Sequence, residues 1–173
     1  SLTTSAVKAL TTAQIEALTT GQIAGLTTSN IASLTSAQVS VLSTDQIVAL
    51  TTAQISAFST SAVAALTTDQ LNALESADFG KLSSAQIGSL KTGQIAGLST
   101  DQIVALTTAQ AGVLTTTQIG ALTTDQIAAL ETADLGSLTT SAVKALTTTQ
   151  IEALTTGQIA GLTTSNIASL TSV

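Results

Sequence analysis

The sequence has 173 residues, of which 44% are hydrophobic and 8% are charged, and its formal net charge is −6. It contains four lysines and no arginine, so it offers no cationic patch for phosphates, and we expect no nucleic-acid binding. The absence of cysteine and histidine excludes disulfides, thiol chemistry and the commonest metal ligands. No apolar run approaches the roughly 18 residues of a membrane span, so we expect no membrane insertion.

An eight-residue pattern runs through the whole chain from Leu2 without insertion or deletion, giving 21 complete octads. Each octad has Leu at position 1, nearly always Thr or Ser at positions 2 and 3, usually Gln at 5, an apolar residue at 6 and a small residue at 8. Phe58 replaces the leucine once, and Ala111 is the smallest residue at position 6. A short fixed period predicts a solenoid. We expect one octapeptide-repeat solenoid over residues 1–173, as a fragment of a longer array.

The octad predicts a short helix that begins at its third residue, as residues 50–57 illustrate. Thr51 and Gln54 have the spacing of a capping box, in which each side chain accepts a hydrogen bond from the other residue's backbone N–H. Leu50 and Ile55 flank this cap as a hydrophobic staple, whereas a flat strand would send them to opposite faces. We therefore predict an all-α solenoid with one helix per octad and positions 4 and 7 outside. A β-solenoid is the alternative, because Thr and Ile favour strands.

The ends of these helices leave one alternative open. In three octads position 2 carries no hydroxyl, and the hydroxyl of position 3 is then an alternative N-cap. These alternative caps are Ser76, Thr92 and Thr132, which follow Glu75, Lys91 and Glu131. Glycines near a helix end suit a left-handed C-terminal turn.

A helix of about six residues is not stable alone, so neighbouring octads must bury one another's Leu and Ile. The first four octads recur 17 octads, or 136 residues, later, and residues 42–49 recur at 98–105, seven octads on. The Ser-Ala-Val octads are separated by seven and ten. These separations fit five, two and three turns at about 3.4 octads per turn. We expect three to four octads per turn, with gene duplication alone as the alternative explanation of the spacings.

Ten acidic residues invite a search for metal ligands. Asp45, Asp69, Asp101 and Asp125 all occupy position 4, in the first helical turn, where the helix dipole favours negative charge. We assign them that structural role.

Two acidic pairs with a spacing of three residues are the candidates for cation binding: Glu75 with Asp78, and Glu131 with Asp134. Calcium takes about six to eight oxygen ligands, usually from a suitable loop, and no calcium-loop motif is present. A purely structural role is therefore the alternative for both pairs. We name no catalytic residue, expect no cofactor, and do not expect an enzyme.

The octads L-T-T-x-Q-I-x-A, repeated without spacers and in higher-order copies, resemble the repeat tracts of very long bacterial secreted or surface proteins. Such proteins are often labelled adhesin-like or haem utilisation/adhesion. The resemblance implies an extracellular or cell-surface location and a structural role. We expect a rod-like stalk or spacer whose partners are neighbouring repeats, monomeric or self-associating end to end or laterally. A binding module that presents a repeated Thr/Ser surface to glycan or ice is the alternative.

Overall fold

The computed structural model describes residues 2–170, and within this range it contains 21 α-helices and no strand, with one helix in each octad. The predicted all-α solenoid is confirmed, and the β-solenoid alternative is wrong. The helices are α1 Thr4–Ala9, α2 Thr12–Glu16, α3 Thr20–Ala24, α4 Thr28–Ala32, α5 Ser36–Ser40, α6 Thr44–Val48, α7 Thr52–Ser56, α8 Thr60–Val63, α9 Thr68–Ala73, α10 Ser76–Phe79, α11 Ser84–Gly88, α12 Thr92–Ala96, α13 Thr100–Val104, α14 Thr108–Ala111, α15 Thr116–Ala121, α16 Thr124–Ala129, α17 Thr132–Ser137, α18 Thr140–Lys144, α19 Thr148–Glu152, α20 Thr156–Gly161 and α21 Thr164–Leu170.

The helices begin where the capping box predicts. Thr51 Oγ1 accepts a hydrogen bond from the backbone N–H of Gln54 at 3.3 Å, and Gln54 Oε1 accepts one from the backbone N–H of Thr51 at 2.8 Å. From α2 to α20, this reciprocal pair recurs wherever position 2 has a hydroxyl and position 5 has an amide. Each capping box thus supplies side-chain acceptors for two backbone N–H groups at the start of the helix, and all four groups lie within four residues of sequence.

The three octads without a hydroxyl at position 2 keep the same helix start. Glu75, Lys91 and Glu131 are the N-caps of α10, α12 and α17, although none of their side chains makes a capping bond. The Lys91 ammonium cannot accept a hydrogen bond, yet Gln94 Oε1 still accepts one from the Lys91 backbone N–H at 2.7 Å. The alternative caps at position 3 are therefore wrong, because positions 1 and 6 remain apolar in these octads and keep the helix in the same register.

The helix ends differ from the expectation for glycine. No residue in the described range, glycine included, has a positive φ. Ala57, the C-cap of α7, is right-handed with φ −82° and ψ −10°, and where a position-1 leucine is the C-cap, as at Leu10 and Leu74, it is extended. The predicted left-handed glycine turn is wrong, because the glycines that serve as C-caps, Gly25, Gly80, Gly97 and Gly112, are all right-handed.

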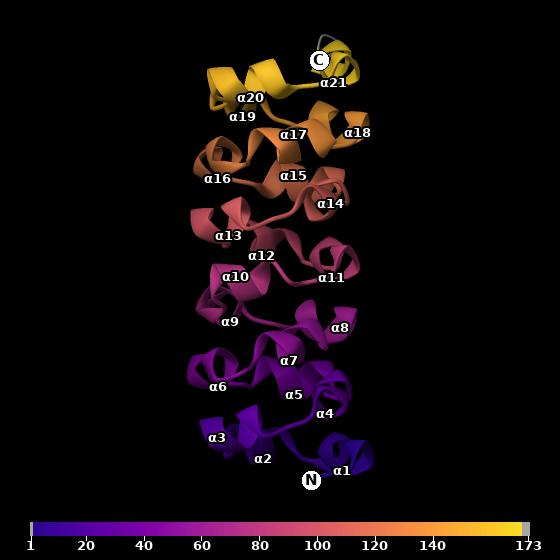
Figure 1. Cartoon of the computed structure of the whole chain (residues 1–173), viewed down its shortest axis with the longest axis vertical. Helices are drawn as coiled ribbons and strands as arrows, with labels where there is room; N and C mark the ends of the chain where they lie inside the picture. The colour runs from indigo at the N-terminus through magenta and orange to yellow at the C-terminus, as the bar shows by residue number, and fades with distance from the viewer. Residues whose placement is uncertain (1, 171–173) are drawn as a thin grey trace. The chain divides into compact units, whose positions relative to one another are not determined.

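The contacts divide the chain into two compact units, Ser1–Leu90 and Lys91–Val173. Within each unit a helix packs against the helix three octads further along. In the first unit α3, α6 and α9 follow one another along one side (Figure 1), and in the second unit α14 packs against α17 and α17 against α20. Side-chain hydrogen bonds reach back to the fourth helix, as described below. Each superhelical turn therefore contains three to four octads, as predicted.

Positions 1 and 6 form the core, and each faces a different neighbouring turn. In the first octad Leu2 is 48% exposed while Val7 is fully buried. Near the other end of the described chain the order is reversed, since Leu154 is 8% exposed and Ile159 is 48% exposed. The leucine therefore packs against the preceding turn and the isoleucine against the following one. Position 4 is exposed and position 7 is mostly exposed, as predicted.

Candidate functional site

The buried polar side chains of the chain lie almost entirely at position 5. Gln38 Nε2 donates to the carbonyl oxygens of Val7 at 2.9 Å and Leu10 at 2.8 Å, at the C-terminus of α1. Each such glutamine therefore caps its own helix with its oxygen and an earlier helix with its nitrogen. We call these residues the glutamine ladder. Its members include Gln38, Gln46, Gln54, Gln70 and Gln86 in the first unit and Gln126, Gln150 and Gln158 in the second.

Sequence reasoning missed this second role of the glutamine, although the sequence carries a signal for it. A capping box accepts Glu as readily as Gln, because only the side-chain oxygen is used. Position 5 nevertheless is Gln or Asn in 16 of the 21 octads and never Glu. An amide differs from a carboxylate by its N–H donors. The preference for an amide therefore indicates a donated hydrogen bond outside the box.

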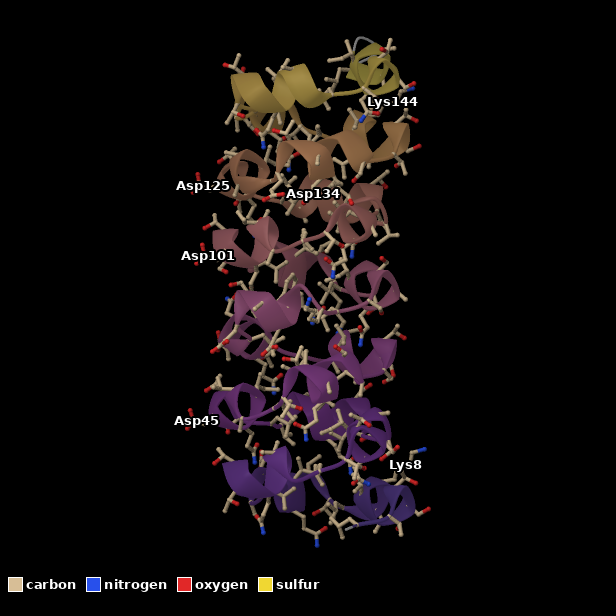
Figure 2. The ribbon with its side chains drawn as sticks, in the orientation of Figure 1. Lys8, Asp45, Asp101, Asp125, Asp134 and Lys144 are labelled. Atoms are coloured by element: carbon tan, nitrogen blue, oxygen red, sulfur yellow. The ribbon has the colours of Figure 1, made fainter. Side chains whose placement is uncertain are left out.

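The aspartates of position 4 lie on the outer surface. Asp45, Asp101 and Asp125 project away from the ribbon (Figure 2), and these residues and Asp69 are exposed in the first turn of their helices. This placement agrees with their predicted interaction with the helix dipole.

The first acidic pair lies in α10. Glu75 is its exposed N-cap, and Asp78 is half-buried in its first turn. Asp78 Oδ1 accepts a hydrogen bond of 2.6 Å from the hydroxyl of Thr52, which lies in α7. This carboxylate is therefore held by a donor from the preceding turn.

The second acidic pair lies in α17 and is different. Asp134 is only 1% exposed, and its Oδ2 has no hydrogen-bond partner. Figure 2 places it among the ribbons rather than outside them. Burial raises the pKa of Asp134 from its ordinary value of 3.8 to about 6, and the negative charge of Glu131 adds to this shift. The two predicted partners thus interact, and their mutual repulsion is unrelieved.

The rest of the described chain offers few other features. Over residues 2–170 no three or more acidic side chains gather as metal ligands, and no cavity is present in that range. None of the described helices is long and apolar enough to cross a membrane. The glutamine ladder and the two acidic pairs are therefore the features that we consider for function.

A family model described as the ALTTAQ repeat matches the chain six times in tandem, at residues 1–28, 24–52, 47–76, 71–108, 103–132 and 127–164. The chain belongs to the ALTTAQ repeat family. Residues 49–54 spell the name, which joins position 8 of one octad to positions 1–5 of the next. Each match to the ALTTAQ repeat spans at least 28 residues, which is also the shorter reach of the ladder bonds. No curated protein matches the chain.

Proposed function

We propose that this ALTTAQ repeat chain is a structural segment, a rod-like stalk or spacer in a large extracellular bacterial protein, and has no catalytic role. The supporting observation is which positions vary. Buried positions 1, 5 and 6 change little between octads, whereas position 7 runs through Lys8, Glu16, Ala24 and Val48. A surface that binds a repeated glycan or ice lattice would keep one chemical character along such a row. The residues that couple successive turns are retained, as are the Thr and Ser of positions 2 and 3, of which position 2 supplies the capping hydroxyl.

The stacking of the turns supports selection on length. A ladder octad directs its leucine and its glutamine amide at the preceding turn and presents its apolar position 6 and its carbonyl oxygens to the following turn. An added octad therefore covers the groups that the preceding turn exposes and presents an equivalent set of groups to the next turn. In such an array stability is a sum of unit and neighbour terms, so length grows without a redesigned core.

Small-angle X-ray scattering on proteins of different octad number tests this proposal. We compare arrays of half, one and two copies of the 136-residue repeat, each first shown to be helical by circular dichroism. The maximum dimension is expected to double from one copy to two. A maximum dimension that stays nearly constant would mean that the array folds back on itself, and this result would contradict the proposed rod-like stalk.

The extracellular location rests on the resemblance to bacterial surface proteins alone. It is tested with antibodies against this segment on intact and lysed cells of the source organism. Labelling of intact cells, or recovery of the segment from the medium, is expected. Labelling confined to lysed cells would contradict the proposed location without affecting the scattering result.

A further inference from the structure

In a ladder octad, two carbonyl oxygens of an earlier helix converge on one amide nitrogen. Gln126 Nε2 lies 2.9 Å from the carbonyl oxygen of Ile95 and 2.7 Å from that of Leu98. Gln158 repeats this arrangement with the carbonyls 31 and 28 residues before it. These paired oxygens belong to the C-terminal end of a helix, where the backbone dipoles concentrate negative potential. They form a place that favours a further donor or a positive charge.

Asp134 occupies this same position of the octad, between the ladder glutamines Gln126 and Gln150. The residues 31 and 28 positions before it are Ile103 and Leu106, at the C-terminal end of α13. An ionised carboxylate has no hydrogen to donate to their carbonyl oxygens, and the aspartate side chain is one methylene shorter than glutamine. The octad register thus assigns Asp134 to the place of a ladder glutamine, and its buried Oδ2 has no hydrogen-bond partner.

Oxygen atoms gathered without a hydrogen between them are the ligand set of a hard cation. Calcium binds carboxylate and backbone carbonyl oxygens together, at about 2.3–2.6 Å. We propose that Asp134, Glu131 and the carbonyl oxygens of Ile103 and Leu106 bind a calcium ion, with water as the remaining ligands on the side of the exposed Glu131. The ion takes the place of the missing amide and joins α17 to the preceding turn.

Two carboxylates at the site favour a divalent cation over a single proton. Asp134 brings one negative charge. Glu131 adds a second negative charge, and the helices that pack against α17, α14 (TAQA) and α20 (TGQIAG), carry no titratable side chain. A calcium ion compensates both carboxylates at once, whereas one proton compensates one.

The test is the thermal unfolding of the 173-residue protein at neutral pH, followed by circular dichroism in EDTA and in increasing CaCl₂. At a calcium concentration ten times the dissociation constant we expect Tm to rise by about 2–4 °C, with a dissociation constant of about 0.1–1 mM. Isothermal titration calorimetry is expected to give one calcium ion per chain.

Two matched variants locate the site. Asp134→Gln restores the ladder amide, and we expect it to raise Tm in EDTA and to abolish the response to calcium. Asp78→Gln removes the same charge from the sister octad and is expected to keep the calcium response of the wild type. Because Asp134→Gln is expected to be the more stable protein, loss of its response cannot be attributed to unfolding.

Three results would overturn the proposal. The first is a wild-type Tm that does not change with calcium. The second is an equal calcium response in Asp134→Gln, which would place any binding elsewhere. The third is an equal rise in NaCl of the same ionic strength, which would reduce the effect to screening of the net negative charge.

Discussion

The octads at residues 74–81 and 130–137 share Leu, Glu, Ala, Asp and Gly at five of their eight positions, yet their aspartates have different surroundings. Asp78 is half-buried and accepts a hydrogen bond from Thr52, whereas Asp134 is buried with an unpartnered oxygen. Both aspartates occupy the position of a ladder glutamine. Nearly the same local sequence therefore yields a satisfied surface carboxylate in one unit and an unsatisfied interior one in the other.

The difference follows from the helix that each octad packs against. In the first unit α10, with the bulky Phe79 at position 6, packs against α7, which carries Ile55. In the second, α17 has the smaller Leu135 and packs against α14, which carries Ala111. Smaller residues on both sides let the helices pack more closely, and we attribute the deeper position of Asp134 to this. The surroundings of a side chain therefore depend on the residues of the helix that lies one superhelical turn away.

The largest expected effect tests whether the second unit tolerates a buried carboxylate only at position 5. Ile103→Asp places one at position 6, among side chains without polar partners, and we expect a loss of about 3–5 kcal/mol in the free energy of unfolding. Asp101→Ala, two residues away on the outer face, is expected to cost less than about 1 kcal/mol. Denaturant unfolding followed by circular dichroism measures both. Equal losses would mean that the inner and outer faces are wrongly assigned.

Removal of a ladder amide tests how much stability comes from the cross-turn hydrogen bond, for which the two aspartate octads have no amide donor. Gln126→Ala removes the side-chain donor to the carbonyl oxygens of Ile95 and Leu98, of which that of Ile95 keeps its bond from the Leu98 backbone N–H. We expect a loss of about 2–3 kcal/mol in denaturant unfolding. The matched control is Gln14→Ala, because Gln14 is exposed and makes only its capping box. Its loss is expected to be about 1 kcal/mol. If the two variants lose equal stability, the cross-turn bonds contribute nothing.

The pH dependence separates the two aspartates directly. The folded-state pKa of Asp134, about 6, lies above its ordinary value of 3.8, so the folded state binds the proton more tightly than the unfolded state. In EDTA, this group's contribution to stability therefore falls as pH rises from about 4 to about 6, by about 1–3 kcal/mol. Asp134→Gln is expected to lose this component of the pH profile, and Asp78→Gln to retain it. Unfolding curves at several pH values decide the matter; identical profiles for wild type and Asp134→Gln would refute the assignment.

The smallest expected effect tests the close packing around α17 from its other side. A Cβ atom on Gly161, in α20, would collide with the Cγ2 methyl group of Thr132 in α17. We expect Gly161→Ala to cost about 1–2 kcal/mol. Gly157 lies in the same helix with nothing within 4 Å of an added Cβ, and Gly157→Ala is expected to gain about 0.5–1 kcal/mol. Thermal unfolding compares the pair. A gain in both would show that α17 and α20 have room to separate.

The local features of this fold were predictable from the sequence. The helix starts follow from Thr51 and Gln54 and their equivalents, because a capping box joins residues only three apart. The core positions follow from Leu50 and Ile55, since their spacing is that of a hydrophobic staple on either side of the N-cap. The turn of three to four octads was predictable from the spacing of recurring octads. The pairing of Glu131 with Asp134 was also within reach, because both lie in one helical turn.

The tertiary structure alone showed which oxygens accept a hydrogen bond from the amide nitrogen of a ladder glutamine, and which aspartate is buried. Gln126 donates to oxygens 28 and 31 residues away, and no short-range pattern specifies that distance. Asp78 and Asp134 have almost the same neighbours in sequence, but the helices packed against them differ in volume. Short-range sequence controls the backbone torsions and caps of each octad. The solvation of a buried carboxylate depends instead on atoms that only the superhelical turn brings within hydrogen-bonding distance.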